Sequence, residues 1–246
     1  MKLSTLKFYT SILLFAVSIS AIAQEEKTTE TTNEVVEEVA IDSLKPKDKY
    51  GLRLGLDLSL PIRSLINTDL KGFEATADFR ISKKIYVAAE LGYYNRYEEE
   101  DYIKFTTKGS YIKVGANYNL YKNWLGMTNE IFIGIRYGFS PFSSTLHEYN
   151  PNFYGTYFPE ETVIIEEEYS GLTAHWGEFV IGLKVEVFNN FYMGMTFNLK
   201  KMVSQTQPDN FLNMYVPGFE RVYLNETGFS FNYTLSYAIP IFRKNN

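Results

Sequence analysis

The sequence predicts an all-β protein: an eight-stranded antiparallel up-and-down transmembrane β-barrel with short periplasmic turns and long extracellular loops. Three observations predict this class. Apolar residues recur at every second position through most of the chain from residue 50 onward. These apolar residues are too numerous to fit in the interior of a small barrel. The segments that separate the alternating stretches are alternately short and long. Alternation with period two is the signature of a β-strand.

The first 23 residues have the features of a cleaved secretion signal. Lys2 and Lys7 precede a mostly apolar core over residues 8–19, and residues 21–23, Ala-Ile-Ala, fit the small-x-small cleavage pattern. The core is shorter than the roughly 20 residues that a membrane-spanning helix needs. We therefore expect cleavage near Ala23.

Residues 24–49 are predicted to form a disordered acidic periplasmic tail. This segment is rich in Glu and Thr and has no aromatic residue, so it offers little apolar surface to offset the entropy of ordering. A short docking helix around residues 35–41 is the alternative. The composition changes at Tyr50, which predicts a barrel domain over residues 50–242, followed by a C-terminal tail of residues 243–246.

Composition and motifs exclude several classes of protein. The net charge of −5 argues against a nucleic-acid partner, which would need clustered Lys and Arg. The chain has no cysteine, so it has neither a disulfide framework nor a lipoprotein signal. It also lacks a phosphate-binding loop, a dinucleotide-binding fingerprint and an HExxH zinc motif, so no cofactor or metal is expected.

Eight segments alternate between apolar and polar or small residues, and no convincing helical pattern interrupts them. The predicted strands cover residues 50–60, 73–81, 85–93, 111–120, 130–139, 178–187, 191–200 and 229–241. Their apolar faces supply about forty side chains, whereas the interior of a filled eight-stranded barrel holds roughly a dozen. The apolar faces must therefore point outward, as in a barrel that faces lipid.

The opposite faces of the strands combine glycines with nearly balanced charges. Buried charges must be paired, so we expect a network of salt bridges that fills the lumen. The predicted network contains Arg53, Arg80, Lys113, Arg136, Lys184 and Lys200 with Asp57, Glu74, Asp78, Glu90, Glu130, Glu178 and Glu186.

The connections support the same topology. The long loops are predicted over residues 61–72, 95–109, 140–175 and 202–227, and the short turns over 82–84, 122–128 and 189–190. Outer-membrane barrels have short periplasmic turns and longer outside loops, and an even number of strands leaves both termini in the periplasm. Aromatic residues near the predicted strand ends, Trp176 among them, are expected in two interfacial girdles.

Five stretches of the sequence resemble a known family. They are YGLRLGLDLSLPIRSL, FRISKKIYVAAELG, FTTKGSYIKVGANYNLYKNWLGM, IRYGFSPFSSTL and VSQTQPDNFLNMYVPGFERVY. Together they resemble a family of uncharacterised Gram-negative outer-membrane β-barrel proteins that is catalogued as a domain of unknown function. The resemblance covers residues 50–242 and leaves the acidic tail outside it. It implies a barrel in the outer membrane and supplies no catalytic residues.

Aromatic residues gather in the two longest predicted loops. Loops of this length are usually functional or disordered, and so many aromatic residues favour order, either as a packed cap or as a binding face. The candidates for a binding face are Tyr154, Tyr157, Phe158, Phe211, Tyr215 and Phe219.

A catalytic site has one weak candidate, His175, with Ser170 before it and Glu178 after it. Residues three apart on a strand point to opposite faces, so this spacing argues against a hydrolase triad. The carboxylates of the longest loop have no EF-hand spacing and read as a solvated acidic loop.

The leading hypothesis is a non-enzymatic outer-membrane protein with a structural role, or one that binds an extracellular ligand or an envelope protein through its outer loops. Outer-membrane lipids would surround it. A narrow pore is the first alternative, and a lipid-modifying enzyme centred on His175 is the second and weaker one.

Overall fold

The computed structural model describes residues 48–121, 128–151, 157 and 161–244. The predicted signal peptide and nearly all of the predicted acidic tail lie outside the described residues. Those two predictions, with the cleavage near Ala23, therefore stay predictions.

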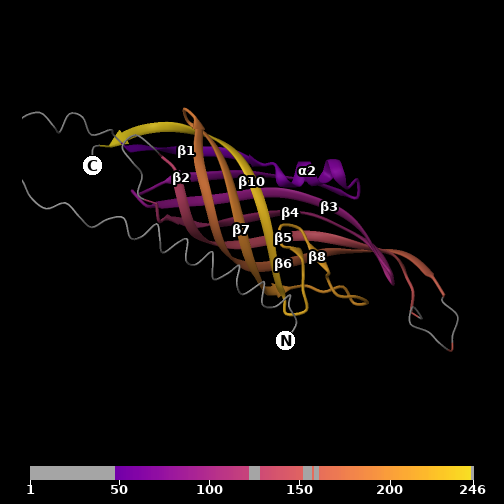
Figure 1. The fold of residues 1–246 in the computed structure, drawn as a ribbon. Helices are drawn as coiled ribbons and strands as arrows, with labels where there is room; N and C mark the ends of the chain where they lie inside the picture. The colour runs from indigo at the N-terminus through magenta and orange to yellow at the C-terminus, as the bar shows by residue number, and fades with distance from the viewer. Residues whose placement is uncertain (1–47, 122–127, 152–156, 158–160, 245–246) are drawn as a thin grey trace, which may run out of the picture. The chain divides into compact units, whose positions relative to one another are not determined.

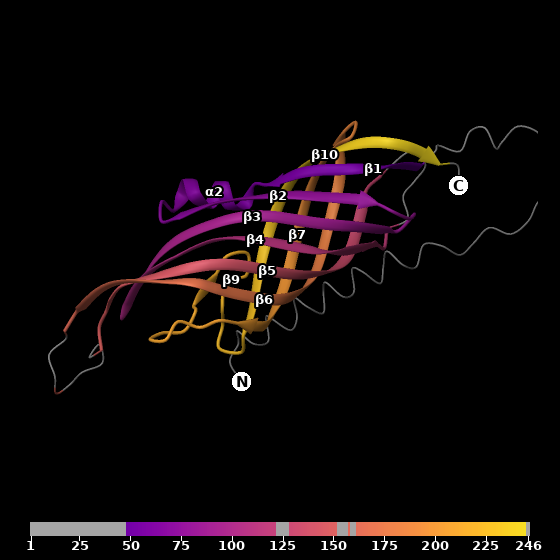
Figure 2. The same ribbon diagram turned by 180° about the vertical axis from the view of Figure 1, so that it is seen from behind.

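Eight long strands of the described residues close into an antiparallel ring (Figures 1 and 2). Each strand pairs with its neighbour along the chain, and the first pairs with the last, so the prediction of an eight-stranded up-and-down barrel is confirmed. Closure leaves no open edge around the ring, as a spanning sheet requires. The strands are β1 (Asp48–Asp57), β2 (Leu70–Arg80), β3 (Ile85–Glu100), β4 (Ile103–Asn119), β5 (Glu130–Tyr149), β6 (Val163–Phe188), β7 (Phe191–Gln205) and β10 (Thr227–Lys244).

The two ends of the barrel differ in their connections. At the terminal end, where β1 begins and β10 ends, the connections are residues 81–84, 120–129 and 189–190. At the opposite end, the loop end, they are residues 58–69, 101–102, 150–162 and 206–226. The last of these contains a small hairpin of β8 (Tyr215–Val216) and β9 (Glu220–Arg221).

The first connection at the loop end contains a helix that the sequence analysis missed, α2 (Ser59–Ile66). Pro61 lies in its first turn, where a backbone N–H would have no partner within the helix, so proline is tolerated there. Eight residues are too few for the helical period to stand out beside the alternation of β1. No helix in the described part of the chain is long and apolar enough to cross a bilayer.

The outer surface of the barrel is apolar, as predicted. We call the outward side chains of its strands the apolar band, and the members named in the next sentence are 39–66% exposed. The band includes Leu54, Leu56, Phe73, Val87, Leu91, Ile112, Val114, Ile131, Ile135, Phe179, Ile181, Leu183, Met193, Met195, Leu199, Phe229, Phe231 and Tyr233. Such a surface fits hydrocarbon rather than water.

Two of the predicted long loops are instead mostly strand. β3 extends to Glu100, and β4 begins at Ile103. Likewise, β5 extends to Tyr149, and β6 begins at Val163. These segments, residues 97–109, 142–149 and 163–173, extend β3–β6 beyond the rest of the ring, and we call them the sheet extension (Figure 2). The prediction of loops was wrong because the outward residues become polar there, although the strands continue.

Candidate functional site

The lumen at the terminal end contains a buried network around Arg53. Its Nη2 donates to Asp78 Oδ1 at 2.7 Å and to Glu130 Oε1 at 2.8 Å. The ammonium of Lys184 forms a further ion pair with Asp78. All four side chains are buried, so each charge has a partner of opposite sign where water is largely excluded.

Aromatic rings complete the packing at this level. The guanidinium of Arg53 lies over the rings of Tyr86 and Tyr192, 5.5 and 4.7 Å from their centroids. Arg80 lies 4.8 Å from the ring centroid of Tyr50. These contacts stack planar cations on aromatic faces and fill space that smaller side chains would leave open.

A second network fills the lumen nearer the loop end. Lys113 lies between two carboxylates, 2.8 Å from Glu74 and 2.6 Å from Glu90. Arg136 Nε lies 3.1 Å from Glu90, and the Tyr111 hydroxyl donates to Glu74 at 2.8 Å. The predicted salt-bridge network is thus confirmed for these residues and for the network around Arg53.

A third group joins the lumen to the β7–β10 connection. Lys200 Nζ lies 3.9 Å from Glu178 and donates to the backbone carbonyl of Gly218 at 2.8 Å. The indole N–H of Trp176 donates to Glu178 at 2.7 Å. Trp176 is therefore inside the barrel, and its predicted place in an interfacial girdle was wrong.

The described side chains leave little open space in the lumen. Small cavities of about 40, 30 and 10 Å³ lie among them. Each is lined by lumen side chains: the first by Arg53 and Tyr192, the second by Glu90 and Thr196, and the third by Lys113 and Lys200. Since a water molecule needs roughly 10–15 Å³ on this measure, these cavities hold a few waters at most.

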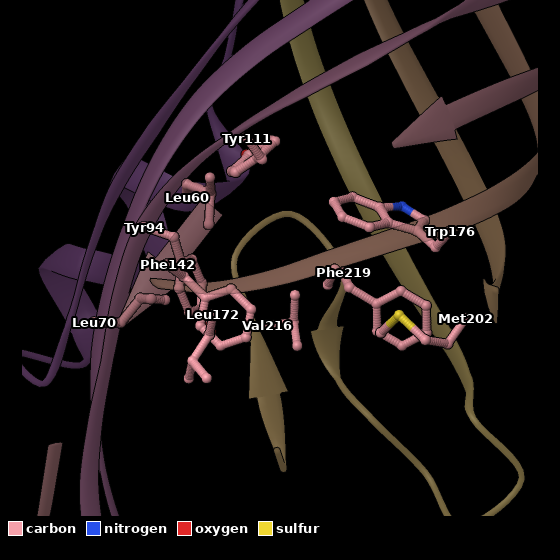
Figure 3. Close-up of a cluster of buried hydrophobic side chains, with 11 residues drawn as sticks. Leu60, Leu70, Tyr94, Tyr111, Phe142, Leu172, Trp176, Met202, Val216 and Phe219 are labelled. Carbon is pink, nitrogen blue, oxygen red and sulfur yellow. The ribbon is translucent and has the colours of Figure 1, made fainter. Parts of the chain in front are cut away.

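Residues 206–226, which we call the cap, close the lumen at the loop end. Phe219 of the cap is fully buried and meets Trp176 edge to face, with ring centroids 5.9 Å apart. Figure 3 shows the cluster in which these residues pack. It contains Leu60, Leu70, Tyr94, Tyr111, Phe142, Leu172, Ala174, Trp176, Met202, Val216 and Phe219.

Tyr111 is one of the residues that position the cap hairpin. The ring of Tyr111 lies against Gly92 of β3 and against Gly218 between β8 and β9. A Cβ on Gly218 would lie 2.5 Å from the ring, and the φ of +79° at Gly218 is one that other residues rarely adopt. Glycine at this position lets the cap approach the barrel interior closely.

The cap also packs against the inner face of the sheet extension. Tyr215 is buried beside Phe105, and the ring centroids of Phe105 and Phe211 are 6.1 Å apart. Arg96 lies 4.2 Å from the ring centroid of Tyr215. Burial raises the pKa of Tyr215, and its protonated hydroxyl donates to Glu98 at 3.3 Å.

The predicted binding residues have different positions in the structure. Tyr154 and Phe158 lie outside the described residues, and Tyr157 is 93% exposed. Tyr215 and Phe219 are buried in the cap, and Phe211 is half-buried. The last three side chains therefore hold the cap in place, while the binding face remains a prediction.

A hollow of about 480 Å³ lies between the cap and the far part of the sheet extension. Ile103 and Leu146 are buried there, and three aromatic side chains, Tyr102, Tyr149 and Phe211, line it with them. The remaining described lining residues are Asn150, Pro151, Ile165 and Asn210, and none of the described lining residues is charged. We call this space the distal hollow.

The distal hollow was not predicted, because all of its described lining residues fall in segments that were predicted as loops. The inward alternation of Ile103, Phe105 and Thr107 was a signal that could have revealed a strand there.

His175 does not form a catalytic couple with Glu178. Its Nδ1 is 2.6 Å from the Tyr137 hydroxyl, and its ring lies 4.8 Å from that of Phe139 on the outer surface. Glu178 points into the lumen, where it contacts Trp176. In the described part of the chain, no group of three or more His, Cys, Asp or Glu side chains could hold a metal ion.

The closed ring, the paired charges inside it and the apolar band outside it define the class of filled transmembrane β-barrels. Within this class, the chain belongs to the family described as "Domain of unknown function (DUF6048)", whose model matches residues 5–244. The match begins well before residue 50, so it also spans the acidic segment that the resemblance had left outside.

The solved structures similar to the chain include three with 8–9% identity. Neisserial surface protein A (NspA) has a TM-score of 0.40 at 9% identity, covering 77% of this chain and 96% of its own. Ail, the attachment invasion locus protein of Yersinia pestis, has a TM-score of 0.37 at 8% identity, covering 78% and 98%. Ail in complex with the heparin analogue sucrose octasulfate has a TM-score of 0.35 at 8% identity, covering 77% and 95%.

These scores add no argument to the architecture, which follows from the strand pairing of this chain. None of the curated proteins compared with the chain matches it.

Proposed function

We propose that the protein is a non-enzymatic, non-conducting barrel of the Gram-negative outer membrane that binds an extracellular ligand or an envelope protein at its loop end. The signal peptide is removed near Ala23, and residues 24–49 then lie in the periplasm with the terminal end. The observation that carries the proposal is the sealed lumen. Buried ion pairs and the cap fill the path that a pore would need.

The location has a direct test in the outer-membrane fraction. We expect unheated protein to migrate faster in SDS gels than boiled protein, because a closed barrel with all its backbone groups paired resists SDS until it is heated. Recovery in the soluble periplasm without a heat-dependent shift would contradict the proposed location.

The absence of conductance is a second expected result. In planar bilayers, inserted protein should give no resolvable single-channel current, because the lumen cavities are small and separated by ion-paired side chains. Insertion would be verified by the heat-dependent shift of the same preparation. Stable current steps from the intact chain would instead support the narrow pore.

The distal hollow is the favoured place for a ligand or partner to bind. Its volume lies within the range of about 300–1,000 Å³ that is typical of binding pockets, and aromatic walls with a few amides are typical linings. The exposed Tyr157 follows Pro151 in the same connection.

A photo-crosslinking amino acid in place of Tyr102 tests the hollow in intact cells. We expect a discrete adduct that disappears when Phe211→Ala removes one wall of the hollow. The same crosslinker in place of Phe188, exposed at the terminal end, is the control. Identical adducts from both positions, or an adduct unaffected by Phe211→Ala, would argue against binding in the hollow.

A further inference from the structure

Helix α2 has one face packed into the barrel mouth and one face that the described residues leave exposed. Leu60 is buried in the cluster beneath the cap, and Arg63 forms an ion pair with Glu220 of β9 at 2.9 Å. On the other face, Ile62 is exposed, and Leu65 and Ile66 are 85% and 83% exposed. Positions 62, 65 and 66 have the spacing of one stripe along a helix. We call these three residues the α2 stripe.

The α2 stripe prolongs the apolar band toward the loop end. β1 directs Leu54 and Leu56 outward, and the chain enters α2 two residues after β1 ends. Beside α2, β2 directs Phe73 outward, and α2 contacts β2 and β10 (Figures 1 and 2). The α2 stripe therefore follows the outward residues of β1 along the chain and belongs to a helix that contacts the next strand of the band.

The outer face of the sheet extension is mostly polar, although Ile164, the cross-strand partner of Glu148 on this face, is 72% exposed. Lys104 lies 2.9 Å from Glu99 and from Glu148, and Lys108 lies 3.1 Å from Glu168. These side chains are 29–60% exposed, as is normal for ion pairs at a surface in water. The α2 stripe carries no charge, and leaving its exposed aliphatic surface in water would be unfavourable.

We propose that the α2 stripe lies in the interfacial region of the bilayer, with its side chains among the outer ends of the acyl chains. This inference rests on the proposed membrane location. A helix that is apolar on one face lies in the interface plane with that face buried by roughly 5–10 Å. Through Arg63 and Glu220, the helix then ties the cap to the membrane surface.

Depth-dependent fluorescence quenching tests the proposal. Because the chain has no cysteine, a single introduced cysteine would be its only site for a thiol-reactive label. Three single-cysteine variants, Leu65→Cys, Leu54→Cys and Glu99→Cys, would be labelled with an environment-sensitive fluorophore. Each would be folded into phosphatidylcholine vesicles that contain lipid with a nitroxide on the acyl chain. The heat-dependent gel shift would confirm that each variant is folded, since all three positions are solvent-accessible.

We expect about a twofold loss of fluorescence at positions 54 and 65 and little at 99, given the interfacial depth of such a helix. Quenching at 54 without quenching at 65 would overturn the role of α2 and leave the membrane location intact. No quenching at either position would overturn both proposals. Equal quenching at 65 and 99 would also overturn the inference, because it would remove the contrast between α2 and the sheet extension.

Discussion

Replacing Arg53 with methionine is expected to lower the free energy of unfolding by about 3–5 kcal/mol, the usual cost of removing one partner from a buried ion pair. Lys184 would remain beside Asp78, but Glu130, whose side chain is 1% exposed, would lose its ion pair with Arg53. Urea unfolding of the protein in lipid vesicles, followed by tryptophan fluorescence, would measure the change.

Lys201→Met is the matched control for this experiment. Lys201 also faces a carboxylate, Glu226 at 3.7 Å, but both side chains are more than half exposed. Exposed pairs contribute about 0–1 kcal/mol, so the control should unfold close to the wild type. If Arg53→Met and Lys201→Met unfolded at the same urea concentration, the lumen network would not be a major source of stability.

Replacing Gly218 with valine is expected to release the cap while the barrel stays closed. The new side chain would meet the ring of Tyr111, and the positive φ would be strained for a β-branched residue. Backbone strain and overpacking each cost about 1–3 kcal/mol, so the open state of the cap should become on the order of 1,000-fold more populated. Hydrogen exchange over residues 206–226 would measure this opening, with the gel shift as the check on the barrel.

Gly177→Val provides the comparison, because a Cβ on Gly177 meets nothing within 4 Å. In Gly177→Val, the amide hydrogens of the cap should exchange at the same rate as in the wild type. Unchanged protection of the cap in Gly218→Val would show that the contact with Tyr111 does not position the hairpin.

The strand segments that carry the apolar band could be predicted from the sequence, because a hydrocarbon environment imposes the same pattern on every strand. Outward residues are apolar, and inward residues are small or polar. In the sheet extension the pattern is inverted. Phe105 and Leu146 point inward beneath the cap, whereas Lys104 and Lys108 face outward. A search for apolar outward faces therefore ends the strands too early, although the backbone pairing continues.

The composition of the lumen network was predictable, but its pairing was not. Balanced charges on inward faces require partners, yet Lys184 and Asp78 are 106 positions apart and meet only because the ring closes. Trp176 was misplaced although a signal was present. It is two residues from Glu178, so period two places both side chains inside the barrel. Its fit also depends on Gly138 of the adjacent strand, where a Cβ would lie 2.1 Å from the indole.

The position of the cap bears on how the protein is assembled. The cap rests on Tyr111 of β4, Trp176 of β6 and the inner face of β3, and β10, which follows it in the chain, pairs with β1 to complete the ring. The surface that receives the cap exists only after the earlier strands are aligned. A docked cap therefore reports that β3, β4 and β6 are already aligned. With the loop end outside the cell, as proposed, an antibody that recognises only the docked cap would detect molecules that have passed this step and would miss earlier insertion intermediates.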